Sequence, residues 1–346
     1  MRSALFAVLA SAILAPAGAQ STATLRGVDV YRSESFDAGA AYRRFGDEFD
    51  NYVRLRNEGG AHDAAKAEEL RAKMQAEVAG LPGIAFAELS FTDFFSADDR
   101  ALYATFDVVD KADASRLAFN PLPAGDVPDP AGLLAAWKRY MGLGESLSMS
   151  GQISMDRPNC PGFYCLWSGT PEIDGLEARF KAGAQGENAE LRRVLAEDRD
   201  GGKRAAALFV LSYSVSGSDV LSLCGGALTD PDPRVRGAAL QILSDIANHH
   251  PELPVALLRV LPRLDDPSSA VRGKAMGLLV PLSERKAYRD VMLTSAPRLV
   301  KLLELHLPES RDLAYTLLGI ISRKDFDKGD YTSWEKWAKR AAAGKP

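Results

Sequence analysis

Cysteine and histidine are scarce in this sequence of 346 residues, which contains three cysteines and four histidines. Zinc sites in proteins are built mainly from spaced clusters of these residue types. The adjacent His249 and His250 have no spaced third ligand, and no cysteine or histidine lies within fifty residues of the pair Cys160 and Cys165. We therefore predict no metal site and no cofactor.

Motifs of common catalytic sites are missing as well. The sequence contains no Gly-x-Ser-x-Gly elbow and no Gly-x-Gly-x-x-Gly or Walker A phosphate loop. Ser283-Glu-Arg-Lys286 and Ser333-Trp-Glu-Lys336 match the serine-x-x-lysine pattern of penicillin-binding enzymes, but no Lys-Thr-Gly accompanies them, so we interpret both as coincidences. We expect a protein without catalytic residues, and a Ser-His-Asp arrangement stays open as an alternative.

Long apolar runs are also absent, apart from one near the N-terminus. Arg2 precedes ten apolar or small residues from Leu5 to Leu14, and the small residues Ala17-Gly18-Ala19 follow. This is the pattern of a secretory signal peptide, cleaved after Ala19. Ten residues are too few to cross a bilayer core of about 30 Å, although they also suit a buried N-terminal helix. No later run is long enough to span a membrane.

A cleaved signal peptide places the protein in a periplasm or outside the cell, and the sequence does not decide between the two. No cysteine precedes Cys160, so the lipoprotein route, which acylates a cysteine at the cleavage point, is excluded. Disulfide bonds persist in such compartments. Export therefore changes how the few cysteines are interpreted.

The net charge of −4 is unevenly distributed. Residues 188–346 carry 24 Lys or Arg and 20 Asp or Glu, a net charge of +4, while the remainder of the chain has a net charge of −8. Opposite charges favour docking of the two halves or attraction of an acidic partner; alternatively, both are ordinary solvated surfaces. A net charge of +4 lacks the basic stripe that phosphate binding requires, so we predict no nucleic-acid partner.

Four ungapped segments of the second half end in an arginine and repeat one pattern. Counted from that arginine, alanine recurs at +3 and large apolar residues at +4 and +7, the spacing of one helix face. The arginines lie 32, 36 and 39 residues apart, which accommodates two helices and their turns. The closing arginines are Arg204, Arg236, Arg272 and Arg311, and the alanines are Ala207, Ala239, Ala275 and Ala314.

The other helix of each pair is predicted from further apolar segments. Ser218-Asp219 is expected to cap a helix from Val220 to Leu228, and Leu253–Leu264 and Val291–Leu305 are apolar runs of helical length. Asp230-Pro231 and Asp266-Pro267 lie between the helices of a pair. Proline is tolerated in the first turn of a helix and prevents the preceding helix from continuing.

The Asp-Pro-x-x-x-Val-Arg-x-x-Ala-x-x-Leu-like segments at 230–243 and 266–279 resemble the HEAT-repeat family, in the short form related to phycobilin-lyase-type repeats. The resemblance covers about residues 188–330 and implies an armadillo-like α-solenoid. The outer two segments are degenerate, as expected of repeats that cap a stack. The family implies that aspartate of one repeat and arginine of the next form a ladder, here Asp230, Arg236, Asp266 and Arg272. Alternatively, the arginines are ligand-binding cations.

The first half shows no repeat and no family resemblance. Apolar residues at helical spacing predict a helix that presents Tyr42, Phe45, Phe49 and Tyr52 inward, and a second helix at Ala61–Ala79. Alternation predicts strands at Ala101–Val109 and around Leu147–Met155. Asp129-Pro130 is expected to cap a helix that ends near Met141, after a proline-rich loop, Pro121–Pro130. We predict a small α+β domain.

Cys160-Pro-Gly-Phe-Tyr-Cys165 is the most distinctive segment of this half. Two cysteines around Pro-Gly suit a disulfide that closes a short loop in an oxidising compartment. Four intervening residues differ from the two of a thioredoxin-type site. Phe163, Tyr164 and Trp167 form either an exposed aromatic cluster suited to binding or part of the core beneath the loop. Cys224 is expected to be buried among leucines.

These observations divide the chain into a signal peptide (1–19), an α+β domain (20–187), a solenoid (188–330), and a capping segment and tail (331–346) in which Trp334 and Trp337 share a helix face. The leading hypothesis is an exported, non-catalytic protein that binds another protein or a peptide, of unknown oligomeric state. The alternative is a secreted or periplasmic hydrolase with its site at Asp156–Cys165, including Arg157.

Overall fold

The computed structural model describes residues 22–95, 99–153, 160–164, 166–167, 170–214 and 216–344. The predicted signal peptide, Asp156, Arg157 and Cys165 lie outside these residues. These described residues form two compact units, one within residues 1–114 together with 305–308 and the other within residues 115–304 together with 309–346. No helix among the described residues is long and apolar enough to cross a membrane.

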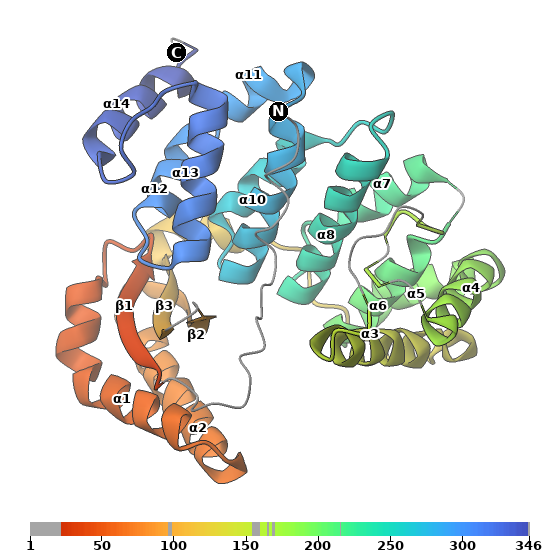
Figure 1. Cartoon of the computed structure of the whole chain (residues 1–346), viewed down its shortest axis with the longest axis horizontal. Helices are drawn as coiled ribbons and strands as arrows, with labels where there is room; N and C mark the ends of the chain where they lie inside the picture. The colour runs from red at the N-terminus through yellow and green to blue at the C-terminus, as the bar shows by residue number, and fades with distance from the viewer. Residues whose placement is uncertain are drawn as a thin grey trace. The chain divides into compact units, whose positions relative to one another are not determined.

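The first unit is a three-stranded sheet with two helices (Figure 1). Its strand order is β1-β3-β2, with β1 parallel and β2 antiparallel to β3. A parallel pair needs a crossover connection, and the helices lie in the connection from β1 to the β2–β3 hairpin. The elements are β1 Thr24–Tyr31, α1 Ala38–Glu58, α2 Ala61–Ala79, β2 Ile84–Phe95 and β3 Arg100–Asp110.

The core of this unit lies between the sheet and the inner faces of α1 and α2. Phe45 and Phe49 of α1 pack on Phe106 of β3, with ring centroids 5.9 and 6.4 Å apart. The predicted helices are confirmed, and Ala61–Ala79 has the expected bounds. The inward position of Tyr42 was wrong: this residue is 47% exposed. Helix α1 is kinked at Phe45, with φ −125° and ψ 17°, so residues before the kink do not continue the buried face regularly.

The strand at Ala101–Val109 is confirmed as the centre of β3. The strand around Leu147–Met155 was wrong over residues 147–153, and Met155 lies outside the described residues. Residues Leu133–Met149 form one helix, α3, longer than predicted. Its inner face, with Trp137, Tyr140 and Gly144 buried, follows helical spacing. Met149 is 60% exposed, so the apolar alternation at its C-terminal end does not reflect a buried sheet face.

The second unit is helical (Figure 1), and its C-terminal part consists of the predicted helix pairs α5–α6, α7–α8, α9–α10 and α12–α13. The fold class, a helical solenoid preceded by a small α+β unit, is confirmed. Its helices are α3, α4 Pro171–Gly186, α5 Asn188–Glu197, α6 Gly201–Leu211, α7 Gly217–Ala227, α8 Pro233–His249, α9 Leu257–Val260, α10 Ser269–Ser283, α11 Arg289–Leu293, α12 Ala296–Leu303, α13 Pro308–Ser322 and α14 Tyr331–Ala342.

The first helices of the later pairs are shorter than the apolar runs suggested. The run at Leu253–Leu264 contains only α9 and the 3-10 helix η3, Leu261–Asp265. Two prolines explain the difference, since Pro254 precedes α9 and Pro262 begins a new turn after it. Helix α7 begins at Gly217, where the Ser216 hydroxyl accepts the Asp219 amide, two residues before the expected Ser218 cap.

Residues 115–187, which the sequence analysis grouped with the sheet, belong to the helical unit. Trp137 of α3 stacks on Phe209 of α6 with ring centroids 4.6 Å apart, and Phe180 of α4 contacts Tyr213 at 5.5 Å. Helices α3 and α4 therefore pack against the first repeat. At the other end, the fully buried Trp334 of α14 packs on Tyr315 of α13.

Candidate binding site

Buried arginine–aspartate pairs connect successive repeats. Arg204 donates from Nε and Nη2 to the Asp230 carboxylate at 2.9 and 2.6 Å. Arg236 does the same to Asp266 at 2.8 and 2.7 Å. Each arginine thus bonds the aspartate of the following repeat, the reverse of the order that the resemblance implied. We call these pairs the ladder.

The same arginines also close the turns of their own repeats. Nη1 of Arg204, Arg236 and Arg272 donates to the carbonyl oxygen six residues earlier, at 2.7, 2.9 and 2.8 Å. All three side chains are at most 2% exposed, so a ligand cannot reach them from solvent. A buried guanidinium that donates to backbone carbonyl oxygens holds the backbone of the turn in place. The geometry therefore supports the interpretation of these arginines as structural residues rather than as ligand-binding cations.

A segment of residues 115–129, here called the strap, lies along the turns that carry the ladder. Its Arg116 donates to the Asp265 carbonyl at 3.0 Å, and its Asn120 amide donates to the Thr229 carbonyl at 2.8 Å. Further along, Gly125 exchanges backbone hydrogen bonds with Glu197 and Arg199, at 2.9 and 2.8 Å. The strap therefore contacts three successive turns in reverse order.

Side chains also fix the strap, at Phe119 and at Val127. The Arg236 guanidinium lies 4.0 Å from the centroid of the Phe119 ring, a cation–π contact. The buried Asp198 accepts the Val127 amide at 2.8 Å and the Lys203 amine at 3.1 Å. Burial opposes ionisation of Asp198, but these bonds and the Asp200 amide lower its pKa overall. The turn edge of the array is thus occupied by the chain itself.

The loop around Cys160 is packed against α6 and α8. Tyr164 and Trp167 are only 3% and 5% exposed, which matches the core alternative for these two side chains. Phe163 is half-buried, contacts His250 with ring centroids 4.9 Å apart, and donates its amide to the Ser212 carbonyl. The disulfide between Cys160 and Cys165 stays a prediction because Cys165 lies outside the described residues.

A buried carboxylate that the sequence analysis missed holds this loop to the helices. Glu177 of α4 accepts from the hydroxyls of Tyr140 and Tyr213 at 3.0 and 3.2 Å. The Tyr140 oxygen in turn accepts the amides of Leu166 and Trp167. Burial and the nearby Glu177 raise the pKa of Tyr140 to about 12, so its hydroxyl stays protonated and donates. A single glutamate in an amphipathic helix carries no sequence signal for such a role.

A second carboxylate links β1 to the segment before α13 within the first unit. Asp29 accepts the amides of His306 and Leu307 at 2.8 and 3.0 Å, and lies 2.7 Å from His306 Nδ1. Carboxylates are favourable at the N-terminal end of a helix. This contact therefore stabilises the start of α13 and holds the segment before it against β1. Across the described ranges, no group of three or more His, Cys, Asp and Glu side chains could hold a metal ion.

The outer helices of the array differ in their charge. Arg193 of α5 pairs with Glu190 and Lys301 of α12 pairs with Glu304. Helix α7, by contrast, has the sequence GSDVLSLCGGA, and its single charge, Asp219, pairs with Arg192 of α5. Its Cys224 is a buried free thiol, as expected. The face that α7 presents beside α9 therefore consists of small and apolar residues.

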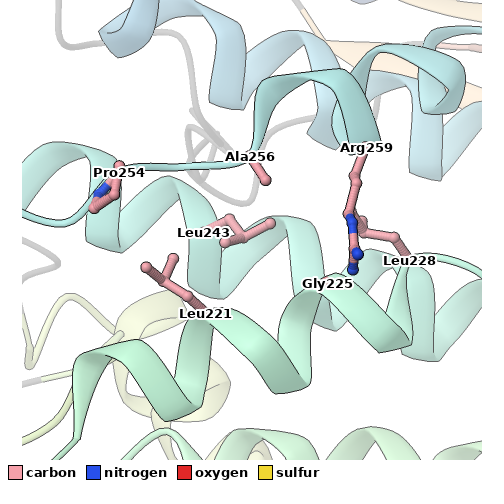
Figure 2. Close-up of a pocket in the computed structure, with 7 residues that line it drawn as sticks. All are labelled: Leu221, Gly225, Leu228, Leu243, Pro254, Ala256 and Arg259. Carbon is pink, nitrogen blue, oxygen red and sulfur yellow. The ribbon is translucent and has the colours of Figure 1, made fainter.

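A pocket of about 280 Å³, including space open to solvent, lies on this face. Figure 2 shows Arg259 reaching from α9 across the pocket toward Gly225 of α7. Its Nη1 atom lies 3.0 Å from the point that a β-carbon on Gly225 would occupy. The lining residues are Leu221, Gly225, Leu228, Leu243, Pro254, Ala256 and Arg259. We refer to this site as the α9 pocket.

The origin of the α9 pocket is the short first helix of the third pair. Helix α7 has 11 residues, whereas α9 has 4 and follows an extended segment through Pro254. A first helix of the third pair as long as α7 would cover the leucines of α7 and α8. Because α9 is short, these leucines line an opening instead. Sequence reasoning predicted a helix across this whole run, so it missed the site; Pro254 and Pro262 were the signal that could have revealed it.

A family model for HEAT repeats matches residues 188–278. The matched segment extends from α5 into α10 and contains the ladder, and the helix pairs around it form a HEAT-type solenoid. No curated protein and no solved structure matches the chain.

Proposed function

We propose that this protein is a non-catalytic scaffold that binds another protein or a peptide through its short HEAT array. HEAT repeats are protein-interaction modules. The observation that supports a partner most directly is the α9 pocket, an apolar opening on an array whose turn edge is covered by the strap. A partner side chain buried there would replace the missing part of the third repeat's first helix.

The scaffold acts outside the cytoplasm in this proposal. The signal-peptide pattern at residues 1–19 and the Cys160–Cys165 spacing support export and a loop-closing disulfide. Mass spectrometry of the protein isolated from cells tests the first, with Gln20 expected as the N-terminal residue. Counting thiols in the unfolded, unreduced protein tests the second, with one free thiol expected and three contradicting the disulfide.

The hydrolase alternative requires titratable side chains that converge on an open cleft. The described residues beside the Cys160 loop are packed side chains, with Tyr140, Tyr164 and Glu177 buried. Asp156, Arg157 and Cys165, which this alternative needs, lie outside the described residues.

Affinity capture tests the proposal. The full mature chain, residues 20–346, is immobilised and exposed to an envelope extract, and retained proteins are identified by mass spectrometry. We expect a specific protein to be retained at physiological salt and to co-purify with the chain in the reverse capture. Retention of no specific protein, together with turnover on a panel of hydrolase substrates, would overturn the scaffold function.

A further inference from the structure

We infer that the α9 pocket takes an aliphatic side chain of a partner segment in which an acidic side chain stands within two residues of it. The inference rests on the proposed binding function and names the chemistry of the partner. Two features carry it: the apolar floor of the pocket and the charge of Arg259.

The floor of the pocket selects an aliphatic side chain. Leu221, Leu228 and Leu243 come from α7 and its partner helix α8, and none of them carries a polar side-chain atom. Water at such a floor is displaced favourably by apolar groups. The opening is partly exposed to solvent, and its leucines offer apolar contacts to an aliphatic side chain of a partner.

The charge at the pocket selects an acidic neighbour. Within the described ranges, Arg259 has no ion pair, whereas the arginines of the flanking repeats, Arg192 and Arg298, pair with Asp219 and Asp265. The Nη1 atom of Arg259 lies over Gly225, and the side chain lines the pocket (Figure 2). A carboxylate next to the buried aliphatic group would complete a charge-assisted hydrogen bond there.

An internal Asp or Glu fits better than a C-terminal carboxylate. Sites that capture chain termini surround them with backbone N–H groups. Leu221 and Gly225 instead lie in the body of α7, where the amides bond within the helix. The positive charge at the rim of the pocket is therefore carried by the Arg259 side chain, without help from backbone N–H groups. An acidic residue on either side of the aliphatic residue in an extended segment can reach it.

A random 12-residue peptide library tests the inference on the full mature chain. The peptides are displayed with their C-termini fused to the coat protein, so that no free C-terminal carboxylate is present. We expect enriched peptides to share Leu, Ile or Val within two positions of Asp or Glu. Their synthetic versions should bind at least about tenfold more weakly to Gly225→Leu, which fills the pocket, and to Arg259→Glu, which reverses its charge.

Two variants match these perturbations without touching the pocket. Gly226 is the next residue of α7, and no atom lies within 4 Å of the point that a β-carbon there would occupy, so Gly226→Leu adds the same side chain to open surface. Lys181→Glu reverses a charge on the exposed surface of α4. Both should bind the peptides as the wild type does. Replacing the peptide's acidic residue by Lys should restore binding to Arg259→Glu.

Several results would overturn the inference. They are enriched peptides without an acidic residue, equal binding to Gly225→Leu and Gly226→Leu, or enrichment only from a library with free C-termini. The scaffold function is tested separately. If an envelope protein is captured equally by the wild type and by Gly225→Leu, the scaffold function holds but the α9 pocket is not the binding site. Circular dichroism of each variant before the binding assay confirms that all are folded.

Discussion

Replacing Arg236 by Ala should strongly destabilise the array. The substitution removes two hydrogen bonds to the Asp266 carboxylate, those to the Asp230 and Pro231 carbonyls, and the contact with Phe119. Removing one partner of a buried ion pair costs about 3–5 kcal/mol, because the other charge stays buried without it. Arg263 and the Ser268 amide still bond Asp266, at 3.2 and 3.0 Å, so we expect the lower end of that range.

Arg234 provides the control, since it lies two residues earlier on the same helix. Its side chain is 62% exposed and pairs with Asp232 at 2.7 Å. Exposed ion pairs contribute about 0–1 kcal/mol, so Arg234→Ala should change the free energy of unfolding by no more than that. Both variants are compared by urea unfolding followed by circular dichroism at pH 7. An Arg236→Ala variant no less stable than Arg234→Ala would refute the role of the ladder.

A double-mutant cycle separates the pair itself from the loss of the arginine stem. Arg236→Met keeps an apolar chain beside Phe119, and Asp266→Asn keeps the bond to the Ser268 amide. If the two side chains stabilise each other directly, the double variant is more stable than the sum of the single effects predicts, by about 1–3 kcal/mol. Additive losses would place the stabilisation elsewhere in the turn.

Three further predictions concern other contacts. Asp198→Asn should reduce the acid sensitivity of the protein. The lowered folded-state pKa of Asp198 stabilises the fold above the unfolded value of about 3.9, and this stabilisation is lost as the pH falls through the folded-state pKa. Below about pH 4, the urea midpoint of the variant should therefore depend less on pH than that of the wild type. Gly144→Ala places a β-carbon 2.0 Å from Trp167 Nε1 and should lower the melting temperature, whereas Gly142→Ala, with open space around it, should stabilise α3 by about 0.5–1 kcal/mol. Asp29→Ala leaves the two amides before α13 without their acceptor and should cost about 1–3 kcal/mol in urea unfolding.

The elements that could be predicted from the sequence are those whose information is local or periodic. The alanine and leucine positions after Arg236 and Arg272 define a helix face without reference to the rest of the fold. The same holds for α2, whose ends are marked by Gly60 and Gly80. The resemblance implied that Asp230, Arg236 and Asp266 form inter-repeat pairs, because the aspartate and arginine of each turn stand at constant spacing, but the order in which they pair is the reverse of the one it implied.

The elements that were missed depend on distant partners. Strand β1 is held by pairing with β3, for example Val28 beside Ala104. The alternation Val28-Asp29-Val30 is too short to reveal the strand alone. The apolar run at Leu253–Leu264 has helical composition, yet its prolines limit the regular helix to four residues. The role of Glu177 arises only where three helices meet.

The strap has a consequence for how the array unfolds. In a solenoid each repeat contacts only its neighbours, so end repeats fray independently and cooperativity decays with distance. Here the contact of Arg116 with Asp265 spans 149 residues, and the strap goes on to join two more repeats. If any one of these repeats unfolds, the strap loses a contact there and holds the other repeats less firmly. We expect the first three repeats to exchange their amide hydrogens as a single cooperative unit rather than in sequence from the ends.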